Sequence, residues 1–257
     1  MIIVNGGKYT PSFFNEEREV CDLEVCKYQA TQDMWMEVME NNPSKFKGGR
    51  RPVENVTWWD ALEFCNKLSE KYGLKPVYDL SRKEEGILRI YQTNNKVEYP
   101  NIADFKKTEG FRLPTEVEWE WFARGGEVAI QDGTFNYKYS GSNNTGEVSW
   151  NDGNSGKQTH DVGTKKPNQL GLYDCSGNVY EWCYDTANSG YISEKTPYVY
   201  DETEKNRMLK GGSWKRLYYN RNEYEISEKY FDEAENSNKY GYGTLEASYG
   251  FRIVRTI

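Results

Sequence analysis

The residues best suited to chemistry gather in one short stretch, Gly171 to Asp185, which reads GLYDCSGNVYEWCYD. The side chains of Asp174 and Glu181 are carboxylates, which either bind a hard cation or accept backbone hydrogen bonds. The main-chain carbonyls of Gly177 and Val179 add the neutral oxygens that calcium also takes. The stretch therefore predicts a calcium site made from these four residues. The alternative is a buried loop whose carboxylates accept backbone N–H groups with no ion.

The same stretch combines turn-forming residues with large apolar side chains. Gly, Asn, Asp and Ser favour turns, whereas Leu172, Tyr173, Tyr180 and Trp182 are too large and apolar for a solvated loop. We therefore expect a loop that folds down onto the core.

Cysteine and histidine offer little further chemistry. The five cysteines, at positions 21, 26, 65, 175 and 183, form no C-x-x-C motif, and His160 is the single histidine. Structural zinc usually takes several such residues at short spacing, so a zinc site is not expected. We expect buried free thiols, with a Cys21–Cys26 disulfide as the alternative. His160 has no nucleophile to pair with, and we expect a surface or hydrogen-bonded residue.

Composition narrows the class of protein. The chain has 257 residues, a hydrophobic fraction of 37%, an aromatic fraction of 15% and a net charge of −7. We expect one domain spanning residues 1–257, monomeric, with an aromatic core. The negative charge argues against a nucleic-acid partner. No run of roughly 18 apolar residues exists to span a membrane. Residues 1–7 predict a strand and not a signal peptide, although a chain that had lost an N-terminal anchor would look the same.

Three capped helices frame the candidate stretch. Thr31 is an N-cap signal before an apolar face at helical spacing. Thr57, with Asp60 three residues later, starts a second helix that ends at Tyr72-Gly73. Thr115 and Glu118 form a capping box, and that helix ends before Gly125. The acidic residues of this third helix are expected to cap and solvate its end rather than catalyse. Strands are expected at residues 2–4, 20–28 and within 75–80, with a hairpin turn at 94–96.

Five stretches resemble, in order, the motifs of the formylglycine-generating enzyme family, also called the sulfatase-modifying-factor domain. They are residues 30–48, 52–70 (PVENVTWWDALEFCNKLSE), 111–126 (FRLPTEVEWEWFARGG), 177–182 (GNVYEW), and KGGSW at 210–214 with YGFRIVR at 249–255. The resemblance implies an α+β, C-type-lectin-like fold with low regular secondary structure, small antiparallel sheets, two to three helices and long loops. It also carries the family's calcium loop onto Asp174, Gly177, Val179 and Glu181.

The resemblance fails at the family's catalytic centre. Enzyme members oxidise a substrate cysteine with two copper-binding cysteines that follow the GGS motif. Those two positions hold Arg216 and Arg221 here, and no cysteine follows Cys183. A guanidinium group cannot replace a thiolate as a copper ligand or redox nucleophile. We therefore expect no catalysis and no copper. The alternative is an oxidase of this family that has moved its chemistry elsewhere.

The segment from about residue 214 to 249 is rich in tyrosine and asparagine. Such compositions are typical of binding loops, and this arrangement resembles the variable proteins of diversity-generating retroelements. The resemblance implies a non-catalytic, cell-surface lipoprotein with a hypervariable face for a protein or glycan ligand. A carbohydrate-binding module and simple tyrosine packing are the alternatives. The candidate binding residues are Trp214, Arg216, Tyr218, Tyr219, Arg221, Tyr224, Tyr240, Tyr242 and Tyr249.

Overall fold

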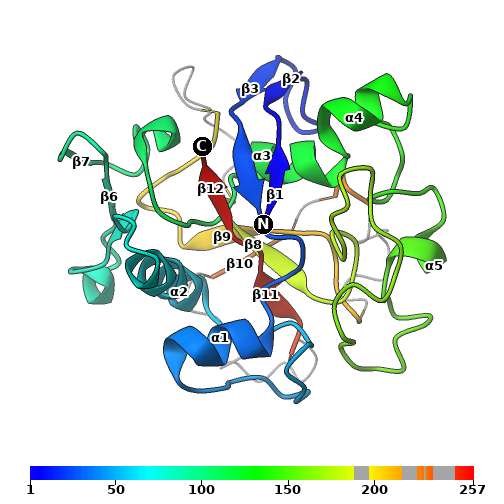
Figure 1. Cartoon of the computed structure of the whole chain (residues 1–257). Coiled ribbons are helices and arrows are strands. Elements are labelled where there is room, and N and C mark those ends of the chain that lie inside the picture. Colours follow the sequence, from blue (N-terminus) through cyan, green and yellow to red (C-terminus); the bar gives the residue numbers. More distant parts are fainter. Residues whose placement is uncertain (188–196, 216–224, 229, 234–246) are drawn as a thin grey trace.

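Four small sheets organise the chain in the computed structural model, which describes residues 1–187, 197–215, 225–228, 230–233 and 247–257 (Figure 1). The sheet orders are β1-β4-β12, β10-β9-β8-β11, β2-β3 and β5-β6-β7. All pairings are antiparallel except β11 with β8, which is parallel. The strands are β1 (Ile2–Val4), β2 (Gly7–Tyr9), β3 (Arg18–Val20), β4 (Leu23–Val25), β5 (Tyr78–Asp79), β6 (Arg89–Tyr91), β7 (Val97–Glu98), β8 (Tyr180–Thr186), β9 (Asn206–Lys210), β10 (Tyr230–Glu233), β11 (Tyr249–Phe251) and β12 (Val254–Thr256).

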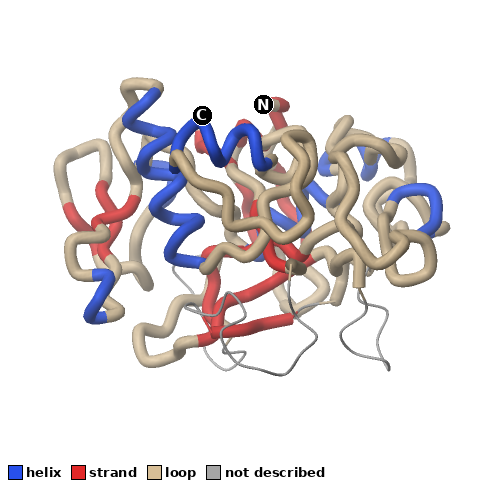
Figure 2. Tube along the Cα trace, turned by 90° about the horizontal axis from the view of Figure 1, so that it is seen from below, coloured by secondary structure: helices blue, strands red, loops and turns tan. Residues whose placement is uncertain are grey.

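The two ends of the described chain lie side by side. Strands β1 and β12 both pair with β4, so that Val25 faces Ile2 on one side and Val254 on the other. Figures 1 and 2 show the N and C labels close together in both views. The strand expected at residues 20–28 is therefore two strands: β3 ends at Val20 and pairs with β2, and β4 starts only at Leu23.

The three expected helices form with the expected caps. Helix α1 (Gln32–Met39) has Thr31 as its N-cap, and the side chain of Thr31 accepts from Met34 N. Helix α2 (Trp58–Lys71) and helix α3 (Glu116–Ala123) each start with a complete capping box, at Thr57 and Thr115. Among the described residues, no helix combines the length and apolar character needed to cross a membrane.

Shorter helical segments were not expected. They are α4 (Gly126–Gln131), α5 (Thr145–Val148) and the 3₁₀ helices η1 (Lys83–Glu85) and η2 (Phe105–Lys107). Helix α4 follows Gly125, whose φ of 93° ends α3 and redirects the chain. Most of residues 132–179 is loop, and in Figure 1 much of it lies on the opposite side of the central strands from α2.

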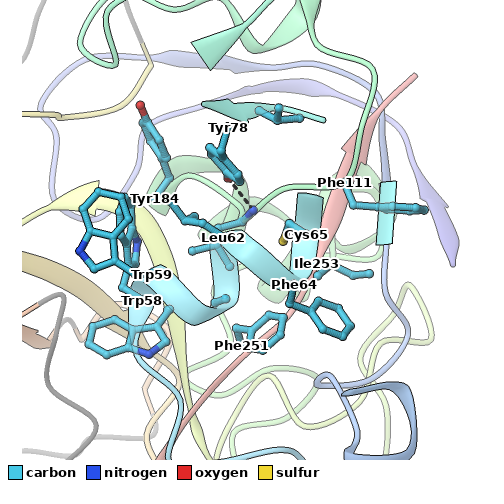
Figure 3. Close-up of a cluster of buried hydrophobic side chains, with 14 of the residues drawn as sticks. Trp58, Trp59, Leu62, Phe64, Cys65, Tyr78, Phe111, Tyr184, Phe251 and Ile253 are labelled. Carbon is cyan, nitrogen blue, oxygen red and sulfur yellow. Dashed lines mark hydrogen bonds between the residues drawn. The ribbon is translucent and has the colours of Figure 1, made fainter. Parts of the chain in front are cut away.

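Aromatic side chains dominate the larger core cluster, which joins α1 and α2 to the sheets (Figure 3). Trp35 stacks on Phe64 with ring centroids 5.5 Å apart, and Phe251 meets Phe64 edge-on at 5.2 Å. The phenol oxygen of Tyr78 accepts a hydrogen bond from Leu113 N at 3.0 Å. Packing of this kind confirms the expectation of an aromatic core and fixes α2 against the strand that carries the candidate site.

The second core cluster surrounds α3 and corrects one expectation. The acidic side chains of this helix are buried rather than solvated. Glu118 forms two hydrogen bonds with Arg112, at 2.7 and 2.8 Å, and Glu116 lies 3.5 Å from the Lys210 ammonium. The helix end faces the sheet and not solvent, so each carboxylate there needs a buried cationic partner.

Candidate functional site

Tyr180 to Asp185, which were expected to belong to the same loop, form part of strand β8 instead. The loop at residues 171–179 folds down onto the core, as predicted. It enters β8 after a series of turns in which Asp174, Gly177 and Asn178 take positive φ values of 59°, 85° and 65°. Its backbone groups find partners in other segments: Gly177 N donates to Gly211 O at 2.7 Å, and Asn178 N donates to Trp150 O at 2.9 Å. The loop is therefore held by two distant parts of the chain, at Trp150 and at Gly211.

Three carbonyl oxygens of this loop and one carboxylate oxygen of β8 converge on one point, as the calcium prediction requires, but a nitrogen occupies that point. The Nε2 atom of Gln29 lies 3.0 Å from Asp174 O, 3.2 Å from Gly177 O, 2.9 Å from Val179 O and 3.1 Å from Glu181 Oε1. Gln29 is fully buried. The Asp174 oxygen is the main-chain carbonyl, whereas the sequence pattern predicted its carboxylate.

The carboxylate of Glu181 is already neutralised in this arrangement. Arg252 donates from Nη2 to Oε1 at 2.7 Å and from Nε to Oε2 at 3.0 Å, and Trp119 Nε1 donates to Oε2 at 2.8 Å. Glu181 and Arg252 are both fully buried. Removing either partner would leave an unpaired buried charge, so the pair holds β8 to the C-terminal strand segment.

The Asp174 side chain points to a different partner. Its Oδ2 accepts from Gly163 N at 2.8 Å, which is the backbone-capping role of the alternative interpretation. Its Oδ1 is buried and has no hydrogen-bond partner among the described residues. Burial raises the pKa of this carboxyl to about 6, against the lowering effects of the Gly163 hydrogen bond and Arg252. The described residues do not fit calcium at the predicted centre, because Gln29 fills it and Arg252 neutralises Glu181.

The two candidate binding residues that the structure describes are both buried. Trp214 is 8% exposed and Tyr249 is 4% exposed. Tyr249 belongs to β11 and packs edge-on against Tyr180 and Trp182 at 6.0 and 5.4 Å. The expectation that Trp214 and Tyr249 are displayed is therefore wrong: the Trp214 indole is buried and donates to Ala247 O, and the strand of Tyr249 pairs with β8 inside the core. The other candidates, Arg216, Tyr218, Tyr219, Arg221, Tyr224, Tyr240 and Tyr242, lie outside the described residues.

Trp214 and Ala247 connect the two ends of the candidate binding segment. Trp214 Nε1 donates to Ala247 O at 2.7 Å, and Ala247 N donates to Asn55 Oδ1 at 3.0 Å. Trp214 N also donates to Asn178 O at 2.8 Å, and Tyr180 N donates to Ser248 O at 2.7 Å. We refer to these four hydrogen bonds as the clamp. Two of them tie the ends of residues 215–246 to the GNVYEW residues (177–182), one joins the ends to each other and one ties Ala247 to Asn55.

Part of the segment between these ends is scaffold. Strand β10 pairs with β9 and extends the sheet, with Phe231 opposite Met208. Ile226 is 1% exposed, belongs to the second core cluster, and its N–H donates to Lys138 O at 2.9 Å. A hypervariable surface in this segment would therefore have to spare these positions.

All five cysteines lie in the described residues, and all are free thiols. Cys26, Cys65, Cys175 and Cys183 are buried, and Cys21 is half-buried. Burial raises the pKa of every one, in Cys175 to about 12. Because the thiolate is the reactive form, none is poised as a nucleophile or soft-metal ligand. His160 Nε2 lies 2.6 Å from Ser155 O and the ring stacks on Trp150, which agrees with a hydrogen-bonded, structural histidine.

Comparison with known proteins gives this architecture a family. The whole chain, residues 1–257, matches the family described as Sulfatase-modifying factor enzyme 1-like domain. The chain belongs to this family. Its fold is the α+β, C-type-lectin-like fold expected for a family member.

Three similar proteins have names that indicate different roles. The Chaperone protein LppX of Paenibacillus barcinonensis is 35% identical over 280 residues, covering 100% of this chain and 89% of that protein. The solved structure of Treponema denticola variable protein 1 aligns with a TM-score of 0.75 and 32% identity, covering 100% of this chain and 95% of that one. The formylglycine-generating enzyme of Thermomonospora curvata is 32% identical over 185 residues, and the match covers 63% of this chain and 54% of the enzyme.

Sequence reasoning missed the two residues that complete the site. Gln29 precedes α1 with no motif to mark it, and only its convergence with a loop about 150 positions away gives it a role. Arg252 lies within the YGFRIVR motif, so a signal for it existed, but that motif does not reveal its partner Glu181.

Proposed function

We propose that this family member is a non-catalytic binding protein that presents residues 215–246 to a macromolecular ligand. The clamp carries this proposal: its four hydrogen bonds join the two ends of the segment to each other and fix them to Asn55, Asn178 and Tyr180. A segment held this way can vary in its middle while its ends keep their place. The 32% identity to Treponema denticola variable protein 1 over the full chain supports the same assignment.

The cysteine inventory supports the absence of oxidase activity. The positions that the family's enzymes use for copper hold Arg216 and Arg221, and the cysteines that this chain has are structural thiols of raised pKa. If the chain were an oxidase of the formylglycine-generating type, it would bind copper and consume oxygen in the presence of a cysteine peptide. We expect neither activity, and oxygen uptake above a no-protein control would restore the enzyme assignment.

A polypeptide is the ligand class that we favour. The name of the Paenibacillus relative, a chaperone protein, is compatible with polypeptide binding by this scaffold. Tyrosine and arginine contribute much of the binding energy where they become buried at protein interfaces. Carbohydrate binding is the other candidate, since tyrosine rings also stack on sugars. We propose that the protein lies at the cell surface and that a lipid anchor is its only contact with the membrane. Proteolysis of the surface of intact cells tests this location.

A binding experiment tests whether the tyrosine side chains of the segment contact a ligand or pack in the core. The chain is screened against a displayed peptide library and a glycan array, and the selected ligand is measured again with Tyr218→Ala and Tyr242→Ala. We expect each variant to keep its melting temperature and to lose about 1–2 kcal/mol of binding free energy. Tyr249→Ala is the control, because its ring is in the core and its loss should lower the melting temperature. A similar fall for Tyr218→Ala or Tyr242→Ala would show that those rings are core residues too.

Sequencing the gene in several isolates tests diversification directly. Under the proposal, differences concentrate between codons 215 and 246, fall at adenines of a nearby copy of the 3′ end, and spare the codons of Trp214, Ile226, Ala247 and Tyr249. A uniform segment with no such copy would remove the retroelement part of the proposal. The proposal that the segment binds a ligand with an unvarying sequence would then depend on the binding experiment alone.

A further inference from the structure

We propose that the side-chain amide of Gln29 takes the place of a cation in the GNVYEW loop, so that this chain holds the loop without metal. Three main-chain carbonyls and one carboxylate oxygen surround Nε2 at 2.9–3.2 Å. Carbonyls and carboxylates are the ligands that calcium takes. The loop thus keeps the form of a cation site, with an amide nitrogen at its centre.

The spacing of the four oxygens suits hydrogen bonds. Calcium binds oxygen at roughly 2.3–2.6 Å and takes six to eight ligands. Here four oxygens lie at distances that suit N–H donors, which mostly fall at roughly 2.7–3.2 Å. An amide NH₂ has two protons, so the four acceptors must share them. The group at the centre is therefore a partial positive charge shared among oxygens, which is the electrostatic role of an ion in such a loop.

The charge balance around Gln29 also favours a neutral occupant. The negative charge of Glu181 is already paired with Arg252 through two hydrogen bonds. The carboxylate of Asp174 accepts from Gly163 N through Oδ2, and among the described residues it makes no hydrogen bond with Gln29. A divalent ion would add two positive charges to a pocket with one paired carboxylate, whereas the amide adds none. The Gln29 Oε1 atom is the cost of this arrangement, because it is buried and accepts no hydrogen bond from any residue that the structure describes.

The proposal has an isosteric test in Gln29→Glu, which replaces the central NH₂ group by oxygen. Five oxygens then face one another in a buried site, and they repel unless a cation lies between them. We expect this variant to be destabilised in EDTA and to recover roughly 5–10 °C in melting temperature at a CaCl₂ concentration 100 times its dissociation constant. The wild-type melting temperature should be equal in EDTA and CaCl₂.

Gln32→Glu is the matched control. Gln32 is also fully buried, and its Nε2 donates to Phe46 O at 2.8 Å and Pro52 O at 3.2 Å. The same substitution there places a carboxylate oxygen against carbonyls. It lacks a second carboxylate and the four oxygens that surround Gln29 Nε2, which we call the cage. We expect a comparable loss of stability and no recovery with CaCl₂. Recovery of both variants would mean that calcium acts non-specifically, and would overturn the assignment of the cage to Gln29.

Terbium luminescence reports ion binding directly and does not rely on a melting temperature. Trp119 Nε1 lies 2.8 Å from Glu181 Oε2, so an ion in the cage would be sensitised by this indole. We expect no sensitised emission from the wild type titrated with TbCl₃, and emission that CaCl₂ displaces from Gln29→Glu. Should that variant fail to fold, Gln29→Ala, which opens the cage, takes its place with the same expectation. Wild-type emission displaced by CaCl₂, or wild-type stabilisation by CaCl₂, would overturn the proposal.

Discussion

The carboxyl group of Asp174 should make this protein less stable as the pH rises from about 4 to about 7, and Asp174→Asn should remove that contribution. Burial raises the pKa of this group from 3.8 to about 6 in the folded protein. A raised folded pKa means that the folded state holds the proton more tightly. The stabilisation is therefore complete below the unfolded pKa near 3.8 and is lost as the pH rises through 6.

The size of the effect follows from the two pKa values. A difference of about 2 corresponds to about 3 kcal/mol of unfolding free energy between pH 4 and pH 7. The Asn variant carries no charge, and the φ of 59° at this position is one that asparagine tolerates well. We therefore expect the unfolding free energy of Asp174→Asn to rise by up to about 3 kcal/mol relative to that of the wild type between pH 4 and pH 7. The variant should then be the more stable protein at pH 7.

Urea unfolding, followed by tryptophan fluorescence in EDTA at several pH values, measures this difference. Asp185, whose pKa burial raises to about 8, also lowers wild-type stability as the pH rises, but it contributes equally to both proteins. Asp161 is exposed, and Asp161→Asn serves as the control. It should leave the pH dependence of the unfolding free energy unchanged. If the unfolding free energies of the wild type and Asp174→Asn differ by the same amount at every pH from 4 to 7, then Asp174 has an ordinary pKa in the folded protein and the reasoning is refuted.

Three further substitutions test the scaffold. Arg252→Met leaves Glu181 charged and buried without its partner, and should lower the unfolding free energy by about 3–5 kcal/mol in urea titrations; a loss below about 1 kcal/mol would contradict a buried ion pair. Phe251→Ala removes a fully buried ring between α1 and α2 and should cost about 3–5 kcal/mol by the same measurement, whereas a near-neutral result would place the ring outside the core. Thr57→Ala breaks the capping box of α2 and should cost about 1 kcal/mol, with Thr57→Ser retaining most of the stability if the hydroxyl is the cause.

Local signals in the sequence predicted the helices and the course of the main loop. Thr57 and Thr115 each occur three residues before an acid, and both capping boxes formed because that geometry needs no distant partner. The loop at Gly177 folded onto the core because its neighbours are too apolar to remain in water. The single strand expected at residues 20–28 was divided, since Cys21 and Asp22 turn the chain from one sheet to another.

Contacts between distant segments could not be predicted. Gln29 meets Glu181 across about 150 positions, and no local pattern at either residue records that contact. The Tyr249 side chain illustrates a second limit, because tyrosine suits both a core and a binding surface. Its place in β11, parallel to β8, decided between these roles, and parallel pairing depends on chain topology that composition does not encode.

The clamp has a consequence for how long the segment between its ends can be. Trp214 and Ala247 are already joined through the core, so lengthening the intervening chain adds only the entropy of closing a larger loop. That cost grows with the logarithm of length, at roughly 0.6 kcal/mol for each doubling. Insertions on either side of β10 should therefore leave the melting temperature nearly unchanged. The scaffold can accept new lengths as well as new side chains, and selection for binding can act on both with little loss of folded protein.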